Sequence, residues 1–246
     1  MKKENNAIVI TSIISAVILI VAVLALTTFS PVSKNVVTVE GMSTIKAVPN
    51  LITVYYSIET KGTTSAEAKD ANTLIFNKLK NAITAQGFEE DDLTTQSYNI
   101  YPNTYWENGK ERQDGYKAYH SLKIEFSTDL LDKLSGVLDA GVNSGAGVSS
   151  INFELTQEAQ NDYKAQALEL ASKDAQTKAD AVASGFGKTA GKLVSVQVSD
   201  FGYYPWNLYA SSGRAEDSAL AKESVANIQP SEQEITGRVS ATFKLV

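Results

Sequence analysis

His120 is the only histidine in the 246-residue chain, and no other residue type here is better suited to acid–base chemistry at neutral pH. It lies in the segment GYKAYHSLKIEF, residues 115–126. A catalytic histidine needs a nucleophile at one ring nitrogen and an orienting carboxylate at the other, and the flanking sequence provides neither. Apolar and polar residues alternate here, and His120 shares the parity of Leu122 and Ile124. We therefore predict a structural histidine on the apolar face of a strand, whose neutral ring donates to a backbone carbonyl or caps the end of the sheet.

The remaining candidates for chemistry are weaker. The absence of cysteine excludes thiol nucleophiles, thiolate metal sites and disulfides. The acidic segment EEDDL, residues 89–93, could hold a cation, but it lacks the glycine-punctuated ligand spacing of a calcium loop, so we predict a solvated turn. The glycines of GAG, residues 145–147, lack the lysine and hydroxyl residue of a phosphate loop, so we predict a turn there too. The sequence thus indicates no catalytic residue, no metal ligand and no cofactor. A hydrolase that uses two facing carboxylates stays open as an alternative.

Four aromatic residues close to each other are the candidate binding residues. They lie in FGYYPWNLYA, at the start of a long predicted connection over residues 201–231, and are Tyr203, Tyr204, Trp206 and Tyr209. Exposed aromatic rings could stack on sugars or bury themselves in a partner protein. Covering an open sheet edge is the alternative, and the sequence favours it slightly.

The N-terminus predicts export. Residues 7–29 contain no charged residue and, as a helix, would span about 34 Å, enough for the roughly 30 Å hydrocarbon core of a bilayer. Lys2 and Lys3 precede this segment, so residues 1–6 are expected in the cytoplasm and everything after a linker at 30–35 outside it. The alternative is a signal peptide cleaved near Ala25, which would release the rest of the chain.

The charge of the chain argues against nucleic acid as a partner. The formal net charge is −6, and residues 30–246 carry −7 because two lysines and one glutamate precede them. A nucleic-acid-binding protein needs a basic surface that displaces counterions from phosphates. An acidic exported domain is therefore expected to have protein or glycan partners.

Hydrophobic periodicity predicts an α+β domain over residues 36–246. Strands are expected in 36–61, with a turn at Pro49–Asn50, and in 93–102 and 115–126, with a polar hairpin loop between the latter two. Thr64 and Glu67 form a predicted capping box that begins a helix ending at Gly87. A shorter helix falls within 127–147, a strand covers 148–155, and a long helix follows to about residue 187. Its alanines recur every fourth position, at 167, 171, 175, 179 and 183, which favours close packing on a sheet, with packing on a helix of another subunit as the alternative. Strands at 191–200 and 232–246 complete the order ββαββαβαββ, with three helices and one or more mixed sheets after the transmembrane helix.

Four segments in this order resemble the SIMPL-domain family. They are VTVEGMSTIKAVPN, DLTTQSYNIYPNTYW with GYKAYHSLKIEF, the segment 151–187 that contains the alanine-rich helix, and the terminal EITGRVSATFKLV. The resemblance covers roughly residues 36–246. It implies an α+β protein of the bacterial envelope that tends to self-associate, with a loose link to stress tolerance and immunogenicity, and it transfers no catalytic residue.

The expectation is therefore a membrane-anchored, non-enzymatic module outside the cytoplasm that forms homo-oligomers or binds another envelope protein. A glycan- or cell-wall-binding module that uses the four aromatics is the first alternative. The carboxylate hydrolase is the second.

Overall fold

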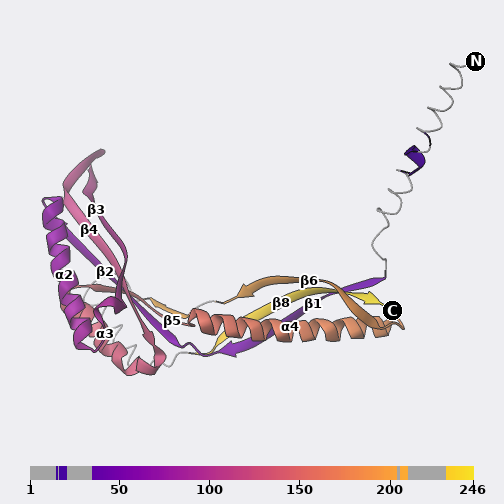
Figure 1. Cartoon of the computed structure of the whole chain (residues 1–246). Coiled ribbons are helices and arrows are strands. Elements are labelled where there is room, and N and C mark those ends of the chain that lie inside the picture. Colours follow the sequence, from indigo (N-terminus) through magenta and orange to yellow (C-terminus); the bar gives the residue numbers. More distant parts are fainter. Residues whose placement is uncertain (1–14, 16, 21–34, 204–205, 210–230) are drawn as a thin grey trace, which may run out of the picture. The chain divides into compact units, whose positions relative to one another are not determined.

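The computed structural model describes residues 15, 17–20, 35–203, 206–209 and 231–246 (Figure 1). The strands are β1 (Val36–Ala47), β2 (Leu51–Gly62), β3 (Leu93–Glu107), β4 (Lys110–Ser127), β5 (Gly147–Glu154), β6 (Ala190–Gly202), β7 (Trp206–Tyr209) and β8 (Gln233–Leu245). The helices are α2 (Ser65–Ala85), α3 (Leu134–Ser144) and α4 (Gln157–Gly185), and short 3-10 helices cover Glu90–Asp92 and Thr128–Lys133. The α+β class and the predicted element order are confirmed for these residues, with β7 as an additional short strand inside the predicted connection 201–231.

Most of the predicted membrane segment, residues 7–29, lies outside the described residues. Residues 15 and 17–20 are helical and exposed. Within the described part of the chain, no helix combines the length and the apolar character needed to cross a membrane.

The chain divides into two compact units. One consists of residues 41–174 and 198–239, and the other of residues 1–40, 175–197 and 240–246. The larger unit contains a five-stranded sheet in the order β3-β4-β2-β5-β7, whose described pairings are all antiparallel. The prediction of a mixed sheet is therefore wrong for these five strands. The remaining described strands form a separate three-stranded sheet in the order β1-β8-β6.

The main core lies between the five-stranded sheet and the helices α2 and α3, which cover one of its faces (Figure 1). Alternate side chains of β2 point into this core, and Ile52, Val54, Tyr56 and Ile58 are fully buried. The Tyr56 hydroxyl donates to the carbonyl of Val137 at 2.8 Å and so ties β2 to α3. Gly141 of α3 allows this contact, because a Cβ there would lie 2.6 Å from the Tyr56 ring.

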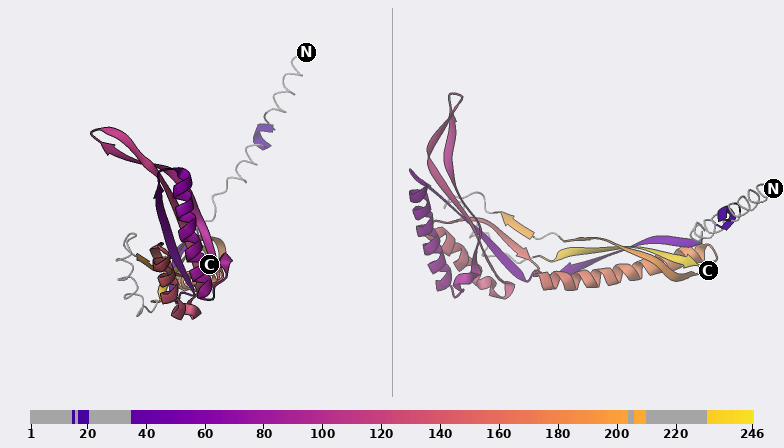
Figure 2. Two further views of the ribbon diagram at one scale, coloured as in Figure 1. Left: turned by 90° about the vertical axis from the view of Figure 1, so that its left-hand side faces the viewer. Right: turned by 45° about the horizontal axis from the view of Figure 1, so that its top comes forward.

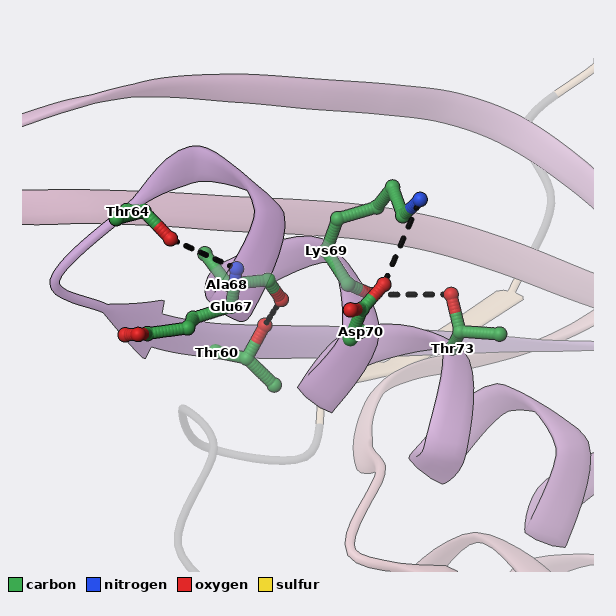
Figure 3. A network of polar contacts seen from close by, with 7 residues as sticks. All are labelled: Thr60, Thr64, Glu67, Ala68, Lys69, Asp70 and Thr73. Atoms are coloured by element: carbon green, nitrogen blue, oxygen red, sulfur yellow. Dashed lines mark hydrogen bonds and ion pairs between the residues drawn. The ribbon is translucent and has the colours of Figure 1, made fainter.

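Helix α2 begins at the predicted cap, and Figure 3 shows the hydrogen bond of the Thr64 side chain at its start. The Thr64 hydroxyl accepts from the backbone N–H of Glu67 at 3.2 Å, as predicted. The Glu67 carboxylate accepts instead from the N–H and the hydroxyl of Thr63, one residue further back. These bonds stabilise the charged form and lower the pKa of Glu67.

The predicted polar loop between β3 and β4 is a continuation of the two strands, which corrects that prediction. Asn108 and Gly109 form a two-residue turn with positive φ angles of 52° and 73°, the combination that joins antiparallel strands tightly. Strand β2 ends opposite Tyr116, so beyond that residue β3 and β4 pair only with each other among the described strands. Figure 2 shows this two-stranded part, the β3–β4 ribbon, projecting beyond the rest of its sheet.

Helix α4 lies along the three-stranded sheet with its alanines inward, which confirms the predicted packing (Figure 1). Ala167, Ala171, Ala175, Ala179 and Ala183 are all fully buried. In the larger unit, the Ser43 hydroxyl of β1 donates to the carbonyl of Ala167 at 2.6 Å. In the smaller unit, the Lys178 ammonium donates to the carbonyl of Glu40 at 3.0 Å. On the exposed side of α4, the Lys173 ammonium contacts the Glu169 carboxylate one turn earlier at 2.6 Å.

Candidate functional site

Strand β6 forms an outer edge of the three-stranded sheet, because its only strand neighbour among the described residues is β8. Its central segment, Leu193 to Ser199, contains no charged residue and no proline. Val194, Val196 and Val198 share one face, and each is 52 to 56% exposed. Such an edge presents free backbone N–H and C=O groups next to apolar side chains, the combination that allows another strand to pair.

The other edges with described side chains carry features that oppose pairing. The exposed face of β1 bears charged residues, Glu40 and Lys46. Strand β3, an edge of the five-stranded sheet, contains Pro102, which has no N–H to donate. Its register with β4 also shifts at two positions, Gln96 and Asn103. Charge, proline and bulges are the usual devices that protect a sheet edge. Strand β6 has neither a charge nor a proline between Leu193 and Ser199.

His120 lies on the buried face of β4, as predicted, and is 7% exposed. Its partners differ from the prediction, since both ring nitrogens contact side chains and not a backbone carbonyl. Nδ1 lies 3.2 Å from Oδ1 of Asn72 on α2, and Nε2 lies 2.9 Å from the hydroxyl of Thr95 on β3. The rings of Phe76 and Tyr98 flank the imidazole at centroid distances of 5.1 and 5.0 Å. Burial in these surroundings lowers the pKa of His120 below its ordinary value of 6.5.

A cavity of about 330 Å³ opens where β2 ends beside the base of the β3–β4 ribbon. It is lined by Lys61, Gly62, Thr63, Asp114 and Gly115. Its lining holds a single carboxylate, whereas glycoside hydrolysis requires two that face each other.

The acidic segment 89–93 forms the predicted turn, in which Glu90 pairs with Lys80 and the backbone N–H of Glu89 donates to Asp92 at 2.8 Å. Across the described ranges, no cluster of three or more ligating side chains could hold a metal ion.

Comparison with known families identifies the chain. The profile of the SIMPL family, described as a protein of unknown function (DUF541), matches residues 37–243 and so includes both sheets and every helix from α2 to α4. The chain belongs to the SIMPL family. The resemblance inferred from the sequence motifs is therefore confirmed.

Three relatives of this SIMPL chain show the range of similarity. The uncharacterized protein YggE of Edwardsiella ictaluri is 27% identical over 197 residues, which cover 78% of this chain and 80% of the relative. YggE of Escherichia coli K12 is 25% identical over 176 residues, or 71% and 70% of the two chains. The 26 kDa periplasmic immunogenic protein of Brucella melitensis is 26% identical over 219 residues, or 85% and 83%.

The structure places only part of the predicted aromatic cluster in the SIMPL chain. Tyr203 packs on a small core that includes Leu155 and Ile235, and its hydroxyl accepts from the backbone N–H of Leu155 at 2.7 Å. Burial raises the pKa of Tyr203. Its ring therefore packs against this core and is not free to bind a partner. Tyr204 lies outside the described residues, and of Trp206 and Tyr209 only the backbone is described, as the ends of β7 paired with β5.

Sequence reasoning overlooked two features. The first is a row of exposed aromatic and aliphatic side chains along β3. Trp106 is 75% exposed, and the others are Tyr98, Ile100, Tyr101 and Tyr105. The Asn108–Gly109 turn was the signal that the strands continue through this region. The second is the uncharged segment of β6. The sequence shows that this segment lacks charges, but its position at a sheet edge depends on the strand order, which the sequence does not show.

Proposed function

We propose that this SIMPL protein is an extracytoplasmic envelope module that assembles with a second copy of itself through β6. The uncharged outer edge of β6, which no other strand of the described residues covers, is the observation that carries the proposal. An assembly role needs no bound cofactor, and the interface would consist of backbone hydrogen bonds along the strand with valines packed beside them. The periplasmic relative of Brucella supports the location outside the cytoplasm.

Charge favours β6 as the contact between copies. Two copies that each carry a net charge of −6 repel one another, so the contact requires a surface free of like charges. The segment from Leu193 to Ser199 is such a surface, and it is bounded by Lys192 and Asp200. If two β6 strands pair antiparallel about Val196, the position of Lys192 falls opposite that of Asp200 in the partner. The same register places Val194 opposite Val198, and β-branched cross-strand pairs stabilise a sheet.

A twofold arrangement follows from this register, because the same strand contributes to both sides of the contact. The predicted membrane helix, residues 7–29, would hold both copies at the same bilayer and raise their local concentration. Membrane attachment is part of the proposal, with secretion after cleavage near Ala25 as its alternative.

Single-cysteine cross-linking tests the proposal directly, because the natural chain has no cysteine. Val196→Cys should form a covalent dimer under mild oxidation, since directly opposed residues of two antiparallel strands lie about 4.5 to 5.5 Å apart at Cβ. Val48→Cys is the matched control, because Val48 is 55% exposed and Val196 is 54% exposed. Equal cross-linking of the two variants would exclude the twofold β6 contact.

Light scattering tests self-association without cross-linking. Val196→Lys introduces a charge in the middle of the edge and should shift the measured mass toward the monomer, while Val48→Lys should leave the mass of the assembly unchanged. A natural chain that stays monomeric at high concentration would contradict self-association altogether.

A further inference from the structure

Thr95 is a residue exposed to solvent whose hydroxyl forms a hydrogen bond with a buried base. Thr95 is an exposed residue of the edge strand β3, and its Oγ1 lies 2.9 Å from Nε2 of His120. The register of β3 against β4 shifts between Thr95 and Ser97, so that Thr95 and Tyr98 both reach the same imidazole. A reactive hydroxyl needs both properties, because the base must take its proton while a substrate reaches its oxygen.

The hydrogen bonds around Asn72 fix the protonation state of this pair. The Asn72 amide nitrogen donates to the carbonyls of Ile58 at 3.2 Å and Ala118 at 3.4 Å, so its Oδ1 must be the atom that faces His120. Oδ1 can only accept, and Nδ1 of the imidazole therefore carries the proton. Nε2 is consequently unprotonated and accepts from Thr95, which is the tautomer that a general base requires.

From this geometry we propose that Thr95 is an activated nucleophile that accepts an acyl group from an activated ester, with His120 as the base and Asn72 as a positioning residue. The order nucleophile, imidazole, amide matches the Cys-His-Asn arrangement of papain-like hydrolases, with a hydroxyl in place of the thiol. The inference goes beyond the assembly function, which uses a different strand and requires no chemistry.

The step balances without a further reactant. A bond forms between Thr95 Oγ1 and the acyl carbon as the bond from that carbon to the leaving oxygen breaks. The hydroxyl proton passes to Nε2 of His120 and from there to the leaving alkoxide or to water. The products are an acyl-threonine and an alcohol, and water can later hydrolyse the acyl-threonine and restore the hydroxyl. The rings of Phe76 and Tyr98 beside the imidazole favour an acyl group with an apolar chain.

The decisive experiment compares two neighbouring hydroxyls in the unmodified protein. The full-length chain is incubated with p-nitrophenyl acetate, and the acetyl group is located by peptide mass spectrometry with fragmentation between residues 94 and 95. Thr94 is also exposed, but its hydroxyl contacts the Lys123 carbonyl and the Gln96 amide and no base. Thr95 should be acetylated about 100-fold faster, the lower range for general-base assistance. Equal rates at the two residues would overturn the proposal.

The pH profile distinguishes a base from a structural histidine. Acetylation of Thr95 should rise as His120 loses its proton and reach a plateau above the pKa of His120, which burial lowers below its ordinary value of 6.5. A rate that keeps rising with pH, as expected for an unassisted hydroxyl, would contradict the role of His120. The comparison uses the natural protein, so it does not depend on whether a variant folds.

Two substitutions at one position complete the test. Thr95→Ser keeps the hydroxyl and should keep acetylation within a few-fold, whereas Thr95→Val keeps the shape and should abolish it. His120→Gln should lower the rate at Thr95 about 100-fold. Retention of the full rate in His120→Gln, with the fold confirmed by circular dichroism, would also overturn the proposal.

Discussion

Asn72 joins helix α2 to two strands through a single side chain. Its amide nitrogen donates to carbonyls of β2 and β4, and its amide oxygen accepts from His120. The residue is fully buried, so water cannot replace any of these partners. A buried polar group left without its partner costs about 1 to 3 kcal/mol. The stability of this region should therefore depend strongly on one asparagine.

The first prediction concerns this residue. Asn72→Ala should lower the free energy of unfolding by about 2 to 3 kcal/mol, because it leaves the imidazole N–H without an acceptor. Asn77→Ala is the matched control, since Asn77 is an exposed position of the same helix, and its effect should stay below about 0.5 kcal/mol. Urea unfolding measures both variants. Similar losses would show that Asn72 has no special structural role.

The second prediction concerns pH. Burial lowers the pKa of folded His120 below 6.5, so between that pKa and 6.5 the unfolded chain binds a proton that the folded chain does not. The free energy of unfolding should therefore fall as the pH decreases below about 6.5 and should show no histidine-dependent change above it. NMR titration of the single imidazole measures the folded pKa directly. His120→Gln should remove this part of the pH dependence, and a folded pKa of 6.5 or more would contradict the prediction.

The sequence predicted the place of His120 but not its neighbours. The alternation of residues 116–126 is a local pattern, and it correctly assigned His120 to the buried face. Asn72 and Thr95 are 48 and 25 residues away along the chain, and they meet the ring only because α2 covers β4 and because β3 shifts its register near Gln96. Contacts that depend on a bulge leave no periodic signal.

At the scale of elements, α4 and β8 approach each other closely at Gly237. A Cβ at this position would lie 2.8 Å from the carbonyl carbon of Ala167 and 3.0 Å from its Cβ. The backbones of α4 and β8 are therefore in close contact at this position. Small residues on both elements make this approach possible, and neither could be enlarged without separating them.

The third prediction tests this contact. Gly237→Ala should lower the free energy of unfolding by about 1 to 3 kcal/mol, the typical effect of overpacking. Gly185→Ala is the control, because a Cβ at Gly185 at the end of α4 meets no atom within 4 Å. Thermal unfolding of both variants would compare them. Equal stability of Gly237→Ala and Gly185→Ala would show that the space between α4 and β8 accommodates a methyl group, which would contradict the prediction.

The predictability of the elements varied with the kind of signal. Caps and periodicity located α2 and α4 well, because Thr64 and the alanine row are local features. The ribbon beyond Tyr101 was missed, because polar residues such as Glu107 and Lys110 on an exposed strand look like a loop. A two-stranded ribbon has no buried face, so it lacks the alternation by which strands are recognised.

At the scale of the whole molecule, the order of elements was predictable, but the division of the strands between two sheets was not. Strands β1 and β2 are adjacent in sequence, separated by Pro49–Asn50, yet they belong to different sheets. Both have the same alternating pattern, so periodicity cannot show that a turn sends the chain into another sheet. Only the long-range pairing of β1 with β8 decides it: the N–H of Leu245 donates to the Asn35 carbonyl, and Thr38 bonds to Thr242.

The fourth prediction concerns the attachment of the chain. If residues 7–29 remain as an anchor, the full-length protein should sediment with membranes and resist an alkaline wash, whereas a chain that begins at residue 35 should stay in the supernatant. N-terminal sequencing of the mature protein separates the two alternatives. A terminus just after Ala25 would show cleavage and contradict the anchor.

The alanine row of α4 has a geometric consequence for the length of that helix. A helix turns by about 100° per residue, so side chains four positions apart are offset by about 40°, and the five alanines wind through roughly 160° around the axis. The contacting surface must wind with them, as a twisted sheet does. Loss of one residue between Ala171 and Ala175 would rotate the alanines from Ala175 onward by about 100° around the helix axis relative to Ala167 and Ala171. Their methyl groups would then face water. Insertions and deletions should therefore be rarer in α4 than substitutions between small residues.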